Sequence, residues 1–185
     1  MQKSEVREIL QHAGIPCASK PDSQEICFIT RGKYADYIEN RLPHRIPSPG
    51  DIIDVNGKKL GRHKGLHRYT IGQRQGLGIS ARYPLYVVEM DPTTNVLVVG
   101  SKTDATRYSF RVINPVWSAI DSPVDAFVCE VQIRYRHTPV AAKIHPLDDG
   151  SVRVELIDKP AIIAPGQGAA FYRGDLVLGG GEIRI

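Results

Sequence analysis

The sequence lacks a long hydrophobic run and has few cysteines, and each shortage excludes a class of protein. No apolar stretch approaches the ~20 residues that a membrane-spanning helix needs, and residues 1–5 do not resemble a secretory signal. The three cysteines are an odd number without Cys-x-x-Cys spacing, which argues against a disulfide framework and a structural zinc site. We therefore expect a cytoplasmic protein without membrane contact, and we predict no metal site.

Acidic residues are missing from residues 56–88, where the basic residues gather. Seven Lys and Arg fall in this segment, so it carries +7 within a chain whose net charge is +4. Glycine, histidine and tyrosine separate them rather than helix-forming residues, which indicates a loop-rich surface. Lys and Arg on such a surface bind phosphate backbones independently of sequence. The segment predicts a polyanionic partner, with an ordinary solvated face as the alternative.

Two segments near the N-terminus have helical patterns. Residues 5–13 place four apolar side chains on one face, and Gly14 and Pro16 end the pattern. A second short helix is expected over residues 33–41, followed by a proline-containing linker at 45–50.

From residue 51 onward the hydrophobic period changes to two, which is typical of strands. Asn56-Gly57 predicts a tight hairpin turn, and residues 85–90 and 96–99 form a second expected hairpin. Many short strands with Gly and Pro turns indicate a β-sandwich or a small barrel, with a boundary within 100–109. Further strands are expected at 110–112, 127–135, 141–144, 152–157, 169–172 and 176–178.

The cysteines differ in their sequence surroundings. Cys129 alternates with apolar residues in a predicted strand, so we expect it in the core. Cys27 joins the polar segment 20–25 to the apolar run 26–29, and it is either a buried, inert thiol or a reactive one at an exposed edge. Cys17 is interpreted as incidental, although pairing with Cys27 is open.

Two polar segments are candidates for RNA contact. Residues 134–137 (Arg-Tyr-Arg-His) form either a plain strand end or a pair of guanidinium groups with an aromatic ring, which suit a ribose-phosphate or an unstacked base. Residues 165–168 (Pro-Gly-Gln-Gly) form either a plain turn or a rigid loop that presents the amide of Gln167.

Five segments together resemble the bacterial tRNA-specific 2-thiouridylase family. They occur in the family's order and cover essentially the whole chain, which makes the combination highly specific although each segment alone is modest. The segments are Lys20 to Ile29 (KPDSQEICFI), His63 to Gly78 (HKGLHRYTIGQRQGLG), Arg134-Tyr135-Arg136, Pro165-Gly166-Gln167 and Gly179-Gly180-Gly181.

The resemblance implies a sulfurtransferase that converts the wobble uridine of certain tRNAs to 2-thiouridine. In that family ATP activates the C2 oxygen of the base by adenylation. A cysteine persulfide, loaded by a sulfur-relay donor protein, then delivers sulfur, and a second cysteine helps to release it through a disulfide bond. The resemblance places the persulfide on Cys27 and assigns tRNA contacts to Arg134, Tyr135 and Gln167.

This sequence departs from the family in one respect. It lacks the N-terminal ATP-binding domain, with its Ser-Gly-Gly-x-Asp-Ser loop and the partner cysteine, whose position Cys17 does not occupy. The resemblance implies that 1–44 is the end of the catalytic domain, 45–105 a small central basic domain, and 106–185 a C-terminal antiparallel β-barrel. We therefore expect a mainly β fold with short N-terminal helices, and a chain that is inactive alone.

A stand-alone RNA-binding β-barrel module without catalysis is the alternative interpretation. On either interpretation the basic segment holds the tRNA backbone. Its predicted contacts are Lys64, Arg68 and Arg74.

Overall fold

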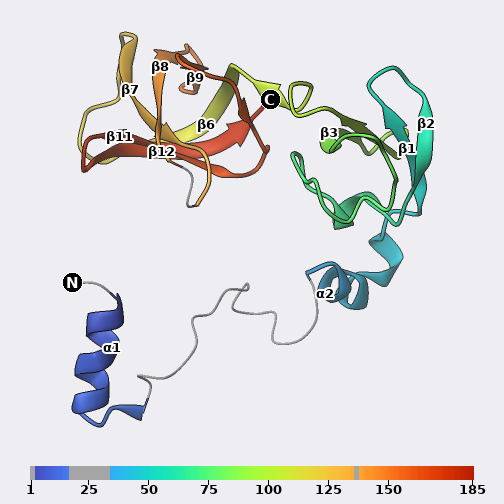
Figure 1. The fold of residues 1–185 in the computed structure, drawn as a ribbon. Coiled ribbons are helices and arrows are strands. Elements are labelled where there is room, and N and C mark those ends of the chain that lie inside the picture. The colour runs from blue at the N-terminus through green and yellow to red at the C-terminus, as the bar shows by residue number, and fades with distance from the viewer. Residues whose placement is uncertain (1–2, 17–33, 136–137) are drawn as a thin grey trace. The chain divides into compact units, whose positions relative to one another are not determined.

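The computed structural model describes residues 3–16, 34–135 and 138–185. Its contacts divide the chain into two units, Met1–Ile46 and Pro47–Ile185. The first unit contains the helices α1 (Lys3–His12) and α2 (Tyr34–Arg41) and a short 3₁₀ helix, η2 (Pro43–Arg45) (Figure 1).

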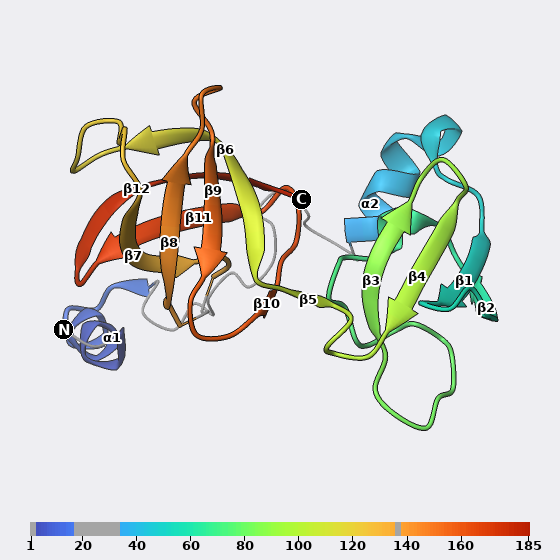
Figure 2. The same cartoon turned by 90° about the horizontal axis from the view of Figure 1, so that it is seen from above.

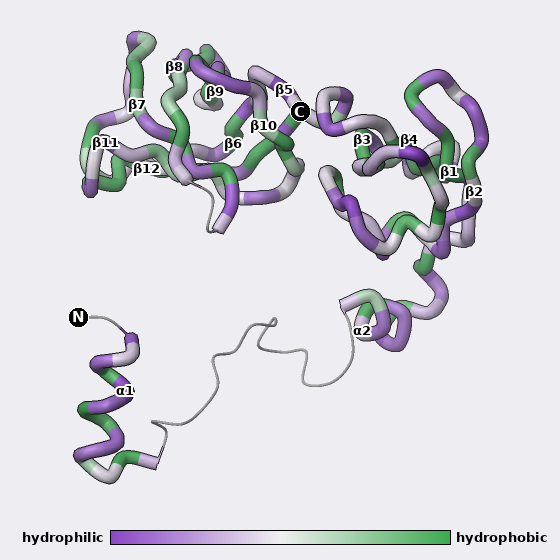
Figure 3. The backbone as a smooth tube through the Cα atoms, viewed as in Figure 1, coloured by the Kyte–Doolittle hydropathy of each residue, from purple (hydrophilic) through white to green (hydrophobic). Residues whose placement is uncertain are grey.

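Both predicted helices are present, and they begin or end within two residues of the expected positions. Apolar and polar residues alternate along α1 (Figure 3), but neither helix buries a side chain. Among the described residues, both helices therefore form without burying a side chain in a hydrophobic core.

The second unit begins with a four-stranded sheet of order β2-β1-β4-β3. The Asn56-Gly57 turn is confirmed: the carboxylate of Asp54 accepts hydrogen bonds from the backbone N–H groups of Asn56 and Lys58, both at 2.9 Å. The two hairpins join through parallel pairing of β1 with β4, which places Ile52 opposite Leu97. The strands are β1 (Gly50–Asp54), β2 (Lys59–His63), β3 (Tyr86–Asp91) and β4 (Val96–Gly100).

A long connection over residues 64–85, which we call the basic loop, links β2 to β3. It contains the 3₁₀ helix η3 (Leu66–Arg68), and its leucines 66, 77 and 85 are buried against the sheet. Burial of these apolar side chains fixes the loop to the sheet, so its polar and basic residues are displayed from an anchored segment.

The remaining strands form a closed antiparallel barrel of order β11-β12-β6-β9-β8-β7 (Figure 2). Alternate residues point inward, so Cys129 and Val131 are buried while Val128 and Glu130 are exposed. The barrel strands are β6 (Ser109–Trp117), β7 (Phe127–Gln132), β8 (Val140–Pro146), β9 (Val152–Leu156), β11 (Gly168–Arg173) and β12 (Leu176–Arg184).

The glycine run in β12 permits close packing of the barrel strands. A Cβ atom at Gly179 would lie 2.4 Å from the backbone oxygen of Val116 in β6, and one at Gly180 would lie 2.4 Å from that of Ala169 in β11. These distances are too short for any side chain, so Gly179 and Gly180 serve the barrel's structure.

A two-stranded ribbon, β5 (Thr106–Arg107) with β10 (Ala161–Ile162), accompanies the barrel. A Cβ atom at Gly72 in the basic loop would lie 2.2 Å from Cγ2 of Ile162, so the loop packs directly against the ribbon.

The predicted fold class is confirmed, because a β-rich domain and a small closed barrel follow short helices. Three strand ends differ from expectation by more than two residues: β6 continues to Trp117 instead of ending at 112, β7 ends at Gln132 instead of 135, and β12 continues to Arg184 instead of ending at 178. The three-part division at 44/45 and 105/106 stays a prediction.

Candidate nucleic-acid interface

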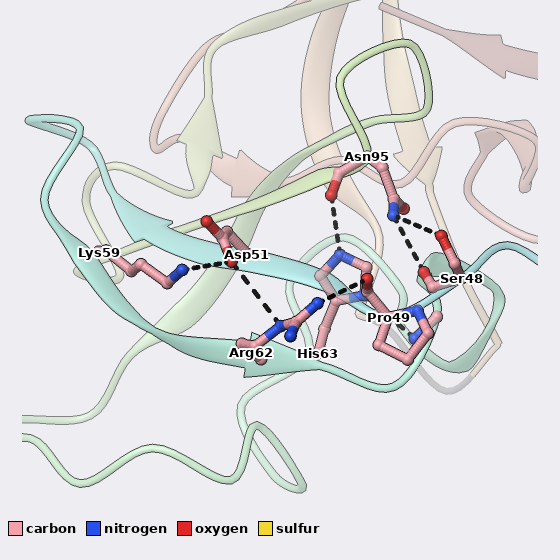
Figure 4. Close-up of polar contacts among 8 residues, drawn as sticks. Ser48, Pro49, Asp51, Lys59, Arg62, His63 and Asn95 are labelled. Atoms are coloured by element: carbon pink, nitrogen blue, oxygen red, sulfur yellow. Dashed lines mark hydrogen bonds and ion pairs between the residues drawn. The ribbon is translucent and has the colours of Figure 1, made fainter.

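A buried histidine holds the start of the basic loop. His63, the last residue of β2, is 1% exposed; its Nε2 donates to the backbone oxygen of Asn95 at 3.1 Å, and its Nδ1 accepts from the Gly65 N–H at 3.0 Å. Asn95 in turn donates from Nδ2 to the backbone oxygen of Ser48 at 3.0 Å (Figure 4). Both imidazole nitrogens are used in the fold, so His63 is not available as a metal ligand or a general base.

Part of the positive charge of the segment 56–88 is neutralised locally. The carboxylate of Asp51 lies 2.7 Å from Nζ of Lys59 and 3.9 Å from Nε of Arg62 (Figure 4). The hydrogen bond from Lys59 lowers the pKa of Asp51 below its usual value of 3.8, so the carboxylate stays charged. The charge available to a ligand therefore comes from other basic side chains.

Arg74 lies in a cavity of about 430 Å³ in the basic loop. The cavity is also lined by Arg82 and Tyr83, and the Tyr83 side chain is 61% exposed. Within the described part of the chain neither guanidinium has an acidic partner. Two guanidinium groups beside an exposed aromatic ring suit a phosphate with a neighbouring base.

Arg134 lies in a second cavity, of about 230 Å³, beside the β5–β10 ribbon. Ile133, just before it, is 3% exposed and anchors the end of β7 in the barrel core. Tyr135 follows and is 87% exposed. The segment after β7 thus presents a guanidinium group and an aromatic ring next to a residue buried in the barrel core.

Gln167 lies in a third cavity, of about 540 Å³, which Tyr69, Arg107 and the acidic Glu89 also line. The turn that carries it is held to β12, because the Gly166 N–H donates to the backbone oxygen of Ile183 at 2.9 Å. The amide side chain is therefore displayed from a rigid loop beside a cation and a tyrosine ring.

The predicted RNA contacts are thus distributed over three cavities of the second unit. The β5–β10 ribbon contributes to two of them, through Thr106 on the Arg134 side and Arg107 on the Gln167 side. Lys64 is exposed on the loop and Arg68 is partly buried, and neither lines one of these cavities. Their assignment, like that of the other contacts, stays a prediction.

The sequence did not single out four of the basic residues beside these cavities. Arg82 is only one of seven cations in the segment 56–88. The other three are isolated basic residues that belong to no recognisable motif. The four residues are Arg82, Lys102, Arg107 and Lys159.

The expected core position of Cys129 is confirmed. Its side chain is 6% exposed, and burial raises the pKa of its thiol to about 11, so it is protonated and unreactive near neutral pH. Cys17 and Cys27 lie outside the described residues, as does Arg136.

Among the described residues, no helix is both long and apolar enough to cross a membrane.

Three family models match successive parts of the chain. They are described as the tRNA methyl transferase HUP domain (residues 1–31), the tRNA methyl transferase PRC-barrel domain (35–101) and the aminomethyltransferase beta-barrel domain (107–183). These descriptions refer to methyl transfer, whereas the similar curated proteins are named for sulfur transfer.

Those proteins are each named tRNA-specific 2-thiouridylase MnmA. The chain is 46% identical to the protein from Moorella thermoacetica over 184 residues, which is 98% of this chain and 50% of that one. It is 44% identical over 193 residues to that of Trichodesmium erythraeum, covering 99% and 53%. It is 42% identical over 181 residues to that of Chloroflexus aurantiacus strain J-10-fl, covering 98% and 50%.

The chain spans about half the length of these relatives. The matches cover nearly all of this chain at 42–46% identity, and three domains of one family match in order. These two findings establish homology. The chain belongs to the tRNA-specific 2-thiouridylase family and corresponds to its C-terminal portion.

Proposed function

We propose that this chain supplies the tRNA-holding part of a tRNA 2-thiouridylase and carries the transferred sulfur on Cys27. The observation that supports tRNA binding is the set of cavities in the second unit. In two of them cationic side chains lie beside a tyrosine ring, and in the third Arg134 lies beside two lysines. Cations bind the phosphate backbone, and rings and amides bind unstacked bases.

Cys27 receives sulfur by thiol exchange. Its thiolate attacks the terminal sulfur of a donor protein's persulfide, so a new S–S bond forms on Cys27 and the donor leaves as a thiolate. Cys129 is unsuited to this step because its buried thiol resists ionisation. The wobble uridine must leave the anticodon stack to reach the persulfide. We propose that the exposed aromatic rings and the Gln167 amide bind the unstacked base.

ATP is implied by the family but does not fit the residues present. The sequence contains neither a Ser-Gly-Gly-x-Asp-Ser loop nor a Gly-x-x-x-x-Gly-Lys-Ser/Thr loop, and the three cavities are lined by strand ends and the basic loop. No step of the proposal assigned to this chain uses ATP. We expect thiolation to require ATP-binding residues supplied from outside this sequence.

A binding titration tests the tRNA part of the proposal. Unmodified tRNA is titrated against the chain at several salt concentrations. Each phosphate that the protein neutralises lowers the slope of log K against log salt by about 0.9, so a steep negative slope is expected. No binding at low salt would overturn the proposal.

A stand-alone RNA-binding module is a second candidate, because the cations, rings and amide proposed to hold tRNA all lie in Pro47–Ile185. Sulfur loading separates the two functions. A cysteine desulfurase charged with radiolabelled sulfur should label the chain, Cys27→Ser should abolish the label, and Cys17→Ser should keep it. Equal labelling of the Cys27→Ser variant would leave only the binding module.

A further inference from the structure

Three basic side chains from distant parts of the sequence meet in the cavity beside Arg134. Lys102 comes from the turn after β4, Arg134 from the segment after β7, and Lys159 from the connection between β9 and β10. Among the residues that the structure describes, the rest of the lining is one threonine and apolar residues, with no acidic residue. None of the three cations has an ion-pair partner within the part of the chain that the structure describes.

Gathering like charges in this way costs free energy of folding. Cations that line one small cavity repel one another, although Lys102, Arg134 and Lys159 are exposed and solvent screens much of this repulsion. An anion in the cavity would remove this cost. Three cations around one cavity, with no acidic residue in its described lining, therefore suit an anionic ligand.

The backbone positions of the cations are fixed before any ligand arrives. Asp104 accepts hydrogen bonds from the backbone N–H of Ser101 at 2.7 Å and from its hydroxyl at 2.6 Å. These bonds lower the pKa of Asp104 and close the turn that carries Lys102. The carboxylate of Asp104 is therefore used within the turn and does not neutralise the cations that line the cavity.

The other two cations are also anchored. Arg134 follows the buried Ile133, and Lys159 precedes Pro160, which restricts Lys159 to extended backbone conformations. The carbon chain of Ile162 lies in the wall of the cavity. A site whose charged groups stand on fixed backbone loses little entropy when it binds.

We propose that Lys102, Arg134 and Lys159 form a subsite for one phosphodiester of the tRNA backbone. The subsite rests on the proposed tRNA-binding function and adds two residues to it. The cavity of about 230 Å³ has room for a phosphate group with its flanking ribose atoms. A phosphate diester carries one negative charge on two oxygens, which three convergent donors can share.

The test uses the complete chain with Lys102→Ala, Lys159→Ala and the double variant. Lys143→Ala is the matched control, because Lys143 is exposed on β8 and lies outside the cavity. Thermal midpoints are measured with and without inorganic phosphate, and tRNA binding is measured against salt concentration.

Each lysine variant should lower the magnitude of the salt slope by about 1, and the double variant should weaken tRNA binding about tenfold. Without phosphate the double variant should melt at a temperature no lower than that of the wild type, since repulsion is relieved. Added phosphate should raise the midpoint of the wild type and of Lys143→Ala, but not that of the double variant.

Two results would overturn the subsite. One is an unchanged affinity and salt slope in the double variant while the wild type binds tRNA. The other is an equal response to phosphate in all four proteins. Failure of the wild type to bind tRNA at all would instead refute the proposed function, and the phosphate response would still report on the cavity.

Discussion

The buried imidazole of His63 joins β2 to the turn between β3 and β4 by donating a hydrogen bond to the backbone oxygen of Asn95 at 3.1 Å. The same ring accepts from the N–H of Gly65 at the start of the basic loop. One side chain therefore fixes both an internal turn of the sheet and the loop that carries Arg74 and Arg82.

Replacing His63 should destabilise the four-stranded sheet. His63→Leu keeps a buried side chain but removes both hydrogen bonds and leaves two backbone groups unpaired, which should cost about 1–3 kcal/mol of unfolding free energy. Urea denaturation measures this. The exposed His44→Leu should change stability by less than about 0.5 kcal/mol, and equal stabilities of the two variants would refute the structural role.

Gly50 is required because the turn at Asn95 approaches it closely. A Cβ atom there would lie 2.0 Å from the backbone oxygen of Asn95 and 2.6 Å from Nε2 of His63. Gly50→Ala should therefore destabilise the protein by about 3 kcal/mol or more. Gly168→Ala, with nothing within 4 Å of the added atom, should be close to neutral when thermal midpoints are compared; a neutral Gly50→Ala would contradict the packing.

Asp149 should make the barrel sensitive to acid. Hydrogen bonds from Ser151 and Arg111 lower its pKa to about 2 from 3.8. A lowered folded-state pKa gives stability that is present above the unfolded value and is lost as the pH falls toward the folded value. Asp149→Asn should therefore melt below the wild type at neutral pH, and the two midpoints should converge as the pH approaches about 2.

The exposed Asp125→Asn serves as the control, and its midpoint at neutral pH should equal that of the wild type. A constant gap between wild type and Asp149→Asn down to the lowest pH would contradict the assignment.

Cys129 should react with alkylating agents only after unfolding. Burial raises the pKa of its thiol to about 11 from 9.0, and its side chain is 6% exposed. Peptide mapping after iodoacetamide treatment at mildly alkaline pH should find Cys129 unmodified in the native protein and modified in urea. Rapid modification of the native protein would show that this part of the barrel opens.

Local patterns in the sequence predict local structure well in this chain. Asn56-Gly57 predicts the first hairpin because the turn depends on two residues, and alternation predicts the inward position of Cys129 because side chains in a strand alternate between faces. The parallel pairing of Ile52 with Leu97 had no such signal, since it depends on how two hairpins meet.

The candidate site shows the same limit. Arg134 and Gln167 occur in recognisable short segments, so the sequence could single them out. Lys102 and Lys159 are ordinary surface lysines in the sequence, and only the closure of the barrel and the position of the β5–β10 ribbon bring them to Arg134.

The most direct test of tRNA binding by this chain is the affinity and salt dependence of Arg134→Ala, with the exposed Arg173→Ala as the control. Loss of the Arg134 guanidinium should weaken tRNA binding by roughly 1–3 kcal/mol and lower the magnitude of the salt slope by about 1, whereas Arg173→Ala should bind as the wild type does. An Arg134→Ala variant with the affinity and slope of the wild type would contradict the account.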